Sequence, residues 1–276
     1  MKIAILSGKG GTGKTTITTN LALAIENCSV IDTDVEEPNS HLFFKPSITE
    51  IIPIYSKVPV VDLSICNLCG KCSSFCKFSA IFSTNKSIII FDESCHDCGG
   101  CSLVCNLNAI TYKKKEIGKI YSGNSNNINF KYGKLNIGQL SGVKIINQLK
   151  RLTEKEEILL IDCPPGTSCS TVSAVSDCDF AIIVVEPTPF GVSDMKMVVE
   201  MLQKMKIKFG FVINKAGLGD NEIYEYAKEK KVPILEEIPF DKKIATLYSE
   251  GEIFSNSLNS YVSIFENIFN KIKEEF

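Results

Sequence analysis

Two runs of cysteines with identical spacing stand in the first half of the chain. Each run has intervals of x2, x2 and x3, and together they comprise Cys66, Cys69, Cys72, Cys76, Cys95, Cys98, Cys101 and Cys105. Thiolates are soft ligands that favour zinc and iron–sulfur clusters, and four of them at this spacing suit a [4Fe-4S] cluster. Zinc is the alternative, but structural zinc sites commonly use two C-x2-C pairs separated by about a dozen or more residues. The sequence therefore predicts two [4Fe-4S] clusters.

The doubled run resembles the bacterial two-cluster ferredoxins, in which the fourth cysteine of each run ligates the other cluster. The proline that usually follows the fourth cysteine is replaced here by Lys77 and Asn106, although both runs keep an Ala-Ile pair at equal distance, Ala80-Ile81 and Ala109-Ile110. The resemblance implies two ligand sets: Cys66, Cys69, Cys72 and Cys105 for one cluster, and Cys76, Cys95, Cys98 and Cys101 for the other.

A glycine-rich loop follows the first apolar segment and has the sequence Gly8-Lys9-Gly10-Gly11-Thr12-Gly13-Lys14-Thr15. The backbone N–H groups of such a loop and the N-terminus of the next helix bind phosphates. Lys14 is expected to neutralise the β- and γ-phosphates, and the Thr15 hydroxyl to coordinate Mg²⁺. The expected nucleotide-binding residues of the loop are Gly8, Gly10, Gly11, Thr12, Gly13, Lys14, Thr15 and Thr16.

A second lysine of this loop, Lys9, stands directly after the first glycine and gives the deviant Walker A pattern K-G-G-T-G-K-T. The pattern resembles that of the MinD, ParA and nitrogenase iron-protein group of P-loop ATPases. In that group the extra lysine reaches the phosphates bound by the opposite subunit, so the resemblance implies ATP as the nucleotide and a homodimer in the ATP state. Lys9 would then oppose charge on the transferring phosphoryl group, as an arginine finger does. The alternative is a solvated loop lysine.

Later segments match the same group in chain order. Asp34 matches the aspartate that orients the attacking water, and Pro38-Asn39 continues this first switch. Asp162 begins the second switch, a D-x-P-P-G segment, and matches the aspartate that supports Mg²⁺ through a water. Asn214 matches the adenine-reading asparagine, whose amide both donates and accepts hydrogen bonds, and Pro239–Asp241 matches a segment that flanks the base. The resemblance thus assigns catalytic roles to Lys9, Lys14, Asp34 and Asp162, although a strand-end carboxylate can instead cap a helix or form a salt bridge.

Apolar segments alternate with amphipathic ones at both ends of the chain. Strands are expected at residues 2–6, 30–32, 158–161, 180–185, 209–213 and 234–238, and helices near 14–25, 142–152, 193–205 and 222–230. Such alternation predicts right-handed crossovers and a mostly parallel sheet with helices on both faces and ligands at the carboxyl ends of the strands.

The middle of the chain breaks this pattern. The pattern loosens around residues 46–59, short strand-like segments at 81–82 and 87–91 accompany the cysteine runs, and a polar segment follows at 113–129. We expect an α/β P-loop ATPase domain made of residues 1–59 and 113–276, with an inserted α+β ferredoxin domain at 60–112. This order resembles a branch described as MinD-superfamily P-loop ATPases with an inserted ferredoxin domain.

The composition argues against several partners. Thirty basic and thirty-two acidic side chains give a formal charge of −2, which provides no electrostatic reason to expect nucleic acid or an anionic membrane. The chain begins without a signal-peptide pattern and contains no apolar run of about 18 residues. We therefore expect a cytoplasmic protein without nucleic acid or stable membrane binding, in a compartment that keeps its cysteines reduced.

The remaining candidate residues carry weaker signals. Cys28 and Cys178 are expected to be small buried hydrophobes. Cys169 stands where nitrogenase iron protein has a cysteine that ligates a shared cluster, and the hypothesis is that paired Cys169 thiolates hold a metal or cluster at the dimer face. His41 and His96 receive no role. Residues 261–276 have a helical apolar pattern and are expected to pack in the core rather than bind a membrane.

Three functions fit these motifs. The favoured one is an ATP-gated electron carrier that passes electrons from its clusters to a redox protein. The alternative is a maturation factor that transfers a cluster or metal to an apo-metalloprotein client. Spatial organisation of DNA or membrane is disfavoured by the balanced charge. Electron transfer is preferred because the eight repeated cysteines are all taken up by two clusters and leave no evident labile ligand.

Overall fold

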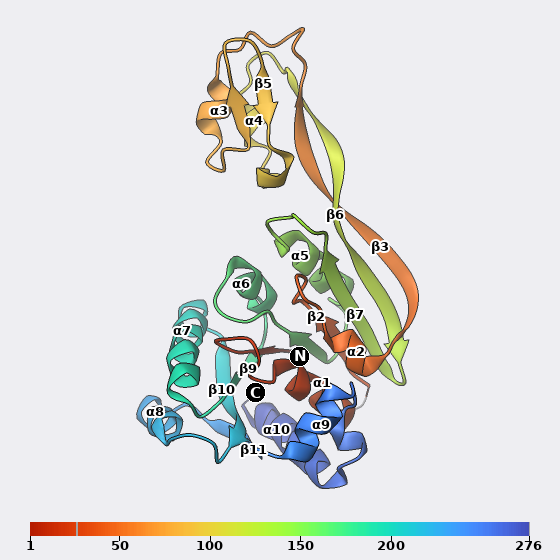
Figure 1. The fold of residues 1–276 in the computed structure, drawn as a ribbon, viewed down its shortest axis with the longest axis vertical. Coiled ribbons are helices and arrows are strands. Elements are labelled where there is room, and N and C mark those ends of the chain that lie inside the picture. Colours follow the sequence, from red (N-terminus) through yellow and green to blue (C-terminus); the bar gives the residue numbers. More distant parts are fainter. Residues whose placement is uncertain (26, 276) are drawn as a thin grey trace. The chain divides into compact units, whose positions relative to one another are not determined.

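The computed structural model describes residues 1–25 and 27–275 of the 276-residue chain, which forms two compact units (Figure 1). The first consists of Met1–Ile51, Ile120–Lys134 and Val143–Phe276. The second consists of Ile52–Lys119 and Leu135–Gly142 and contains both cysteine runs. It is wider than the insertion expected from the sequence, because the strands that flank the cysteine runs belong partly to it.

A nine-stranded sheet has the order β11-β10-β9-β1-β8-β2-β7-β6-β3. Its strands are β1 (Lys2–Leu6), β2 (Ser29–Asp32), β3 (Ser47–Val61), β6 (Ile110–Ser125), β7 (Ile128–Leu135), β8 (Leu159–Asp162), β9 (Phe180–Val185), β10 (Lys208–Ala216) and β11 (Ile234–Pro239). The pairings from β11 to β7 are parallel, which confirms the expected mostly parallel α/β fold. Since β8 lies between β1 and β2, the carboxyl ends of these three strands meet at one edge.

The strands β3 and β6 occupy segments in which the sequence pattern predicted no strand. Each is long, with 15 residues in β3 and 16 in β6. In β6 the buried Ile117 and Ile120 stand among lysines and serines that are exposed or half-buried. The β6 segment therefore lacks the continuous apolar run by which the strands buried on both faces were predicted, whereas the apolar pattern of β3 is interrupted by Pro53 and Pro59.

Helices cover both faces of the sheet in the first unit. They are α1 (Lys14–Ile25), α2 (Ser40–Phe44), α5 (Val143–Leu152), α6 (Cys169–Val175), α7 (Pro189–Met205), α8 (Glu222–Lys230), α9 (Lys242–Ser249) and α10 (Val262–Glu274). One face packs Ile3 and Ile5 of β1 with Ile17 and Leu21 of α1 in a single hydrophobic cluster. Successive strand residues point to opposite faces, so the buried residues Ala4 and Leu6 face the helices of the other layer.

The last helix completes the core of the first unit. Phe265, Ile268 and Ile272 of α10 are buried in the cluster that also contains α1, so the expectation of core packing for this segment is confirmed. Among the described residues, no helix has the length and apolarity needed to cross a membrane.

The second unit repeats one small motif around each cysteine run. Its elements are α3 (Lys71–Phe75), β4 (Ile81–Ser83), β5 (Ile88–Ile90), the 3-10 helix η1 (Asp92–Ser94) and α4 (Gly100–Leu103). Gly70 precedes α3 with φ of 76°, and Gly99 precedes α4 with φ of 73°, a conformation that glycine adopts without strain. A Cβ on Gly100 would lie 2.1 Å from Cε1 of Phe75, so the helices α3 and α4 pack closely only because this residue is glycine.

Candidate nucleotide and cluster sites

The phosphate-binding loop connects the carboxyl end of β1 to the first turn of α1. Gly13 has φ of 97°, and a Cβ there would lie 2.3 Å from Nδ2 of Asn214. That amide nitrogen donates to the carbonyl of Thr12 over 2.8 Å. A Cβ on Gly8 would overlap Asp194 of α7. Glycine at these positions therefore lets the loop fit tightly between β10 and α7.

A cavity of about 320 Å³ opens beside this loop in the first unit. It is lined by Gly11, Gly13, Lys14, Thr15, Thr16, Asp34, Asn39, Asp162, Asn214, Lys215, Ile238, Pro239, Phe240, Asp241, Ile244, Ala245, Tyr248 and Phe254. The structure thus brings Lys14, Thr15, Asp34, Asp162 and Asn214 to one cavity. The remaining expected residues, Gly8, Lys9, Gly10 and Thr12, complete the loop itself.

The hydroxyl of Thr15 contacts both switch segments. Its Oγ1 lies 2.9 Å from Oδ2 of Asp162 and 2.8 Å from Oδ1 of Asn39. Ser40 Oγ donates to the same Oδ2 of Asp162 over 2.6 Å. The other oxygen, Oδ1 of Asp162, is buried without a hydrogen-bond partner among the described residues. Hydroxyl and carboxylate oxygens are the donors that Mg²⁺ prefers, so this oxygen set fits that ion.

Asp32 and Asp162 are buried at this edge of the sheet, and Asp34 lies beside them. Their surroundings disfavour the ionised form of each carboxyl group. Burial, followed by repulsion from Asp162, raises the pKa of Asp32 well above its usual value. Burial also raises the pKa of Asp162. Burial raises the pKa of Asp34 to about 6, against the attraction of Lys14. A cation at this position would favour the ionised forms of all three.

Asp32 organises the first switch, a role that the sequence reasoning did not assign. Its Oδ1 accepts from the backbone N–H of Asp34, and its Oδ2 accepts from those of Asn39 and Ser40, each over 3.0 Å. These bonds fold the chain after β2 so that Ser40 faces Asp162. The available signal was the position of Asp32 at the end of a buried strand, where a carboxylate rarely stays without partners.

Lys9 has a partner inside its own chain. Its Nζ lies 3.4 Å from Oε2 of Glu186, which follows β9. Lys215 pairs with the other oxygen of Glu186. The side chain of Glu186 is only 12% exposed, whereas that of Lys9 is 35% exposed. Glu186 therefore holds two lysines at the phosphate-binding edge, and no sequence motif indicated this acidic residue.

The eight repeated cysteines separate into two groups around two cavities of the second unit. One cavity, of about 460 Å³, is lined by Cys76, Cys95, Cys98 and Cys101 together with other residues. The second, of about 220 Å³, is lined by Cys66, Cys69, Cys72 and Cys105 together with others. Each group has three cysteines from one run and the last cysteine of the other run, which is the grouping expected from the sequence.

Backbone N–H groups donate to two of these sulfurs. Leu68 N donates to Cys66 Sγ over 3.4 Å, and Ala80 N donates to Cys76 Sγ over 3.3 Å. Burial raises the pKa values of the Cys72 and Cys95 thiols. Bonds of this kind, together with metal ligation, stabilise the thiolate form that a cluster requires.

The four cysteines outside the runs differ in exposure. Cys28, Cys163 and Cys178 are buried, which confirms the expectation for Cys28 and Cys178. Cys169 is exposed at the first position of α6, after the N-cap Ser168, whose side chain accepts from Thr171 N. The second switch thus leads directly into a helix that begins with an exposed thiol.

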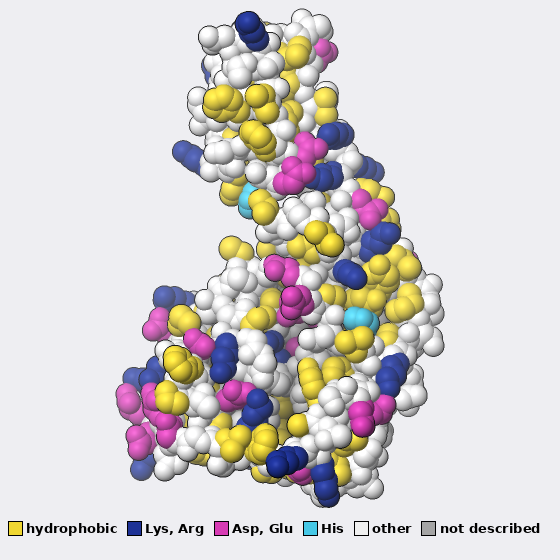
Figure 2. All heavy atoms as spheres, viewed as in Figure 1, with side chains coloured by type: hydrophobic (Ala, Val, Ile, Leu, Met, Phe, Trp, Pro, Cys, Tyr) yellow, Lys and Arg dark blue, Asp and Glu magenta, His cyan; other side chains and the backbone are white. Residues whose placement is uncertain are grey.

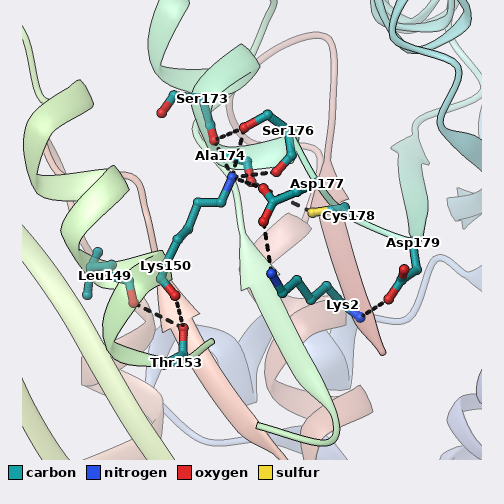
Figure 3. Close-up of polar contacts among 10 residues, drawn as sticks. All are labelled: Lys2, Leu149, Lys150, Thr153, Ser173, Ala174, Ser176, Asp177, Cys178 and Asp179. Atoms are coloured by element: carbon teal, nitrogen blue, oxygen red, sulfur yellow. Dashed lines mark hydrogen bonds and ion pairs between the residues drawn. The ribbon is translucent and has the colours of Figure 1, made fainter. Parts of the chain in front are cut away.

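The far end of α6 is fixed by a lysine of α5 (Figure 3). Lys150 Nζ donates to the carbonyl of Ser173 and the hydroxyl of Ser176, each over 2.8 Å, and also to the Ser176 carbonyl. It forms an ion pair with Asp177, which Lys2 of β1 also contacts at 2.8 Å. A cation at a helix C-terminus stabilises the exposed carbonyls, so Lys150 joins α5 to the helix that follows the second switch.

Two curated proteins are similar in sequence to most of this chain. An uncharacterized protein of Methanocaldococcus jannaschii is 34% identical over 279 residues, which cover 97% of each chain. The iron-sulfur cluster carrier protein of the same organism is 27% identical, over 91% of this chain and 76% of the carrier.

Among solved structures, the septum site-determining protein MinD of Pyrococcus horikoshii in complex with Mg-ADP aligns with a TM-score of 0.60. The two chains are 21% identical, with 98% of this chain and 95% of MinD covered. The model of the CobQ/CobB/MinD/ParA nucleotide binding domain matches residues 3–254, and the fold, the glycine-rich loop and the cavity agree with that match. The chain therefore belongs to the CobQ/CobB/MinD/ParA nucleotide-binding family and has the fold of its P-loop ATPases.

Proposed function

We propose that the protein is a dimeric ATP-hydrolysing iron–sulfur protein in which the bound nucleotide controls electron transfer through two [4Fe-4S] clusters. The observation that carries this proposal is the grouping of the eight cysteines, four around each of two cavities, in a chain that also has a nucleotide cavity. One thiolate for each iron is the usual ligation of a [4Fe-4S] cluster.

A multi-iron cluster explains the cysteines better than a single ion does. The cysteines line cavities of about 220 and 460 Å³. Around a zinc ion all four ligands lie at about 2.3 Å from one centre. Around a [4Fe-4S] cluster each sulfur binds a different iron, so the four sulfurs stand farther apart and enclose the cluster.

The residues of the nucleotide cavity have separate proposed tasks. Lys14 would neutralise phosphate charge, Thr15 would hold Mg²⁺, and Asp162 would support that ion through a water. Asp34 accepts a hydrogen bond from the attacking water and so orients it. Asn214 reads the adenine edge. Mg²⁺, when bound, supplies positive charge that offsets the developing charge of the phosphoryl group.

Lys9 is proposed to change partners between two states. Within one chain it pairs with Glu186. In the ATP dimer it would leave Glu186 and approach the phosphates bound by a second copy of the chain. ATP favours the dimer only to the extent that it binds this arrangement more tightly than the single chain.

The helix α5 is proposed to link the switches to the clusters. It follows directly on Leu135–Gly142, which belongs to the second unit. Gly133 of β7 lets α5 approach the first switch, because a Cβ there would lie 2.5 Å from Ile145 Cγ2 and 2.7 Å from Val35 Cγ1. Lys150 joins the same helix to α6, after the second switch. A movement of either switch would therefore shift α5 and the covalently attached segment.

The proposed partner is a redox protein that docks on the second unit. Figure 2 shows hydrophobic side chains on the surface of this unit. The exposed ones include Leu63, Ile65, Phe75, Phe78, Phe82, Ile89, Phe91, Leu103 and Leu107. Exposed apolar surface of this kind is typical of protein interaction sites.

Electron transfer from the reconstituted, reduced protein to a one-electron acceptor tests the proposal. With MgATP the rate should exceed the rate with MgADP by roughly tenfold, a common size for coupling between two sites. A Lys14→Ala variant, which should lose nucleotide binding, serves as the control and should show one rate in both nucleotides. Equal rates for the wild type with MgATP and MgADP would contradict the proposal that the nucleotide controls electron transfer.

The shared ligation can be tested with two serine variants. Cys105→Ser should disrupt the cluster of the Cys66, Cys69 and Cys72 group and leave the other, although Cys105 belongs to the second run. Cys169→Ser serves as the matched control and should keep both clusters. Loss of the cluster at Cys95, Cys98 and Cys101 in the Cys105→Ser protein would contradict the assignment.

A second candidate function is cluster carriage or assembly for an apo-metalloprotein client. The similarity to a protein named as an iron-sulfur cluster carrier favours it. The test is incubation of the loaded protein with an apo-ferredoxin and MgATP. Transfer of iron and sulfide that depends on ATP hydrolysis would support carriage, whereas clusters retained through many ATP turnovers would support electron transfer.

A further inference from the structure

The hydroxyl of Tyr112 lies at the wall of one cysteine cavity and contacts a sulfur. Tyr112 is the third residue of β6, and its Oη is 3.3 Å from Sγ of Cys101. The same Oη is 3.0 Å from Oγ of Ser102 and 3.1 Å from the carbonyl oxygen of Gly99. Tyr112 also lines the cavity that contains Cys76 and Cys95.

One phenol proton must be shared among these three acceptors. Ser102 Oγ donates to the Gly99 carbonyl over 2.9 Å, so that carbonyl already has a donor. A cysteine sulfur that ligates iron has no proton and can only accept, and hydrogen bonds to an anionic acceptor are stronger than those to a neutral one. The Tyr112 proton is therefore best placed on the Cys101 sulfur once this sulfur is a ligand.

The internal repeat has a serine in place of this tyrosine at the equivalent position of the first run. Tyr112 follows Cys105 at the same interval at which Ser83 follows Cys76. Ser83 lies near the start of α3, because a Cβ on Gly70 would lie 4.0 Å from the Ser83 Cβ. A serine hydroxyl is one bond from Cβ, whereas the tyrosine hydroxyl reaches across the ring. The two cavities thus differ in a donor that faces the third cysteine of each run.

We propose that Tyr112 donates a hydrogen bond to the Cys101 sulfur and makes the two clusters unequal in reduction potential. This proposal rests on the proposed presence of both clusters. A hydrogen bond to a ligating sulfur stabilises the more negative, reduced cluster and so raises its potential. The cluster of Cys76, Cys95, Cys98 and Cys101 therefore takes up the first electron from a one-electron donor protein.

A redox titration of the anaerobic, nucleotide-free protein, followed by electron paramagnetic resonance, tests this inference. The wild type should show two one-electron steps at different potentials. Tyr112→Phe should move the higher step to a more negative potential and leave the lower step unchanged. Tyr121→Phe, in which the altered ring stacks on Tyr132 in the first unit, should leave both steps unchanged.

Fluorotyrosine incorporation provides a second measurement that keeps the ring and its packing. A more acidic phenol donates a stronger hydrogen bond, so the higher step should shift to a more positive potential. An unshifted titration in either Tyr112→Phe or the fluorinated protein, with both clusters present, would overturn the proposal. Two identical potentials in the wild type would also overturn it. A wild type that binds no clusters would instead remove the proposed function itself.

Discussion

The Thr15 hydroxyl and the Asp162 carboxylate are joined by a hydrogen bond of 2.9 Å. The two residues lie 147 positions apart in the sequence and meet because β1 and β8 are parallel neighbours. Asp162 has a second, buried oxygen without a hydrogen-bond partner among the described residues. The first turn of α1 and the second switch thus provide a set of oxygens that an Mg²⁺ ion can join.

Replacing Thr15 by alanine should weaken magnesium-dependent ATP binding by roughly 10–100-fold, the usual cost of losing an interaction at a metal centre. Isothermal titration with ATP in the presence of Mg²⁺ and of EDTA measures the effect. The loss should occur only with Mg²⁺. Thr49→Ala, on the exposed part of β3, is the control. An equal loss in both conditions would show that Thr15 acts on the fold rather than on the ion.

Glu186→Gln should increase the fraction of dimer at a given ATP concentration. The substitution keeps the shape of the side chain but removes the charge that attracts Lys9 and Lys215, so Lys9 is freer to meet the phosphates of a second copy. Light scattering coupled to size exclusion measures the dimer. Lys9→Ala should stay a single chain with ATP and hydrolyse it about 10³-fold more slowly. A lower fraction of dimer in Glu186→Gln than in the wild type would contradict the proposal that Lys9 leaves Glu186 for the phosphates of a second copy.

The kcat/KM for ATP, which depends on the ionisation of the free enzyme, should fall as the pH decreases through about 6. Burial raises the pKa of Asp34 to about 6 from its ordinary 3.8, and in the role proposed for Asp34 a protonated carboxyl is a weaker hydrogen-bond acceptor for the attacking water than a carboxylate is. In the nucleotide-free protein the free energy of unfolding depends on pH in the opposite direction. Because the folded state holds this proton more tightly than the unfolded state, stability decreases as the pH rises from about 4 to about 6.

Asp34→Asn removes the titrating group and supplies the control for both effects. This variant should hydrolyse ATP slowly, without the dependence on pH near 6, and should lack the corresponding change in melting temperature. A hydrolysis profile near pH 6 that is identical in Asp34→Asn would assign the titration to another group.

Lys150→Met should lower the free energy of unfolding by roughly 1–3 kcal/mol, because the carbonyls at the end of α6 and the carboxylate of Asp177 lose their shared donor. Chemical denaturation measures this change. Arg151→Met, at an exposed position of the same helix, should leave stability within about 0.5 kcal/mol. Equal stabilities of the two variants would show that Lys150 does not fix the end of α6.

Much of the nucleotide site could be predicted from local sequence. The glycine loop follows a short apolar strand, and Asp34 and Asp162 stand at or just beyond the ends of two other short apolar strands. In a parallel sheet the carboxyl ends of such strands meet at one edge, so the three segments were expected to lie together. The cysteine grouping was expected from the resemblance to two-cluster ferredoxins, in which the fourth cysteine of each run ligates the other cluster. The strand β6 was missed because its many polar residues hide the period of two, and β3 was missed because Pro53 and Pro59 interrupt its apolar pattern.

Contacts between distant residues could not be predicted in the same way. Lys9 was assigned to the phosphates of a second subunit, and nothing near it in sequence indicates Glu186. Lys150 lies in an amphipathic helix, and the pattern of that helix predicts that its charged face is exposed to solvent. Its role depends on how α5 packs against α6, which is a property of the tertiary structure.

The potentials of the two clusters, measured by redox titration of the anaerobic protein with MgADP and with a non-hydrolysable ATP analogue, test the central claim most directly. We predict that at least one potential shifts when the triphosphate is bound, and that Lys14→Ala abolishes the shift. Identical potentials in both nucleotide states, in protein that binds both nucleotides and contains both clusters, would contradict the coupling of nucleotide to electron transfer.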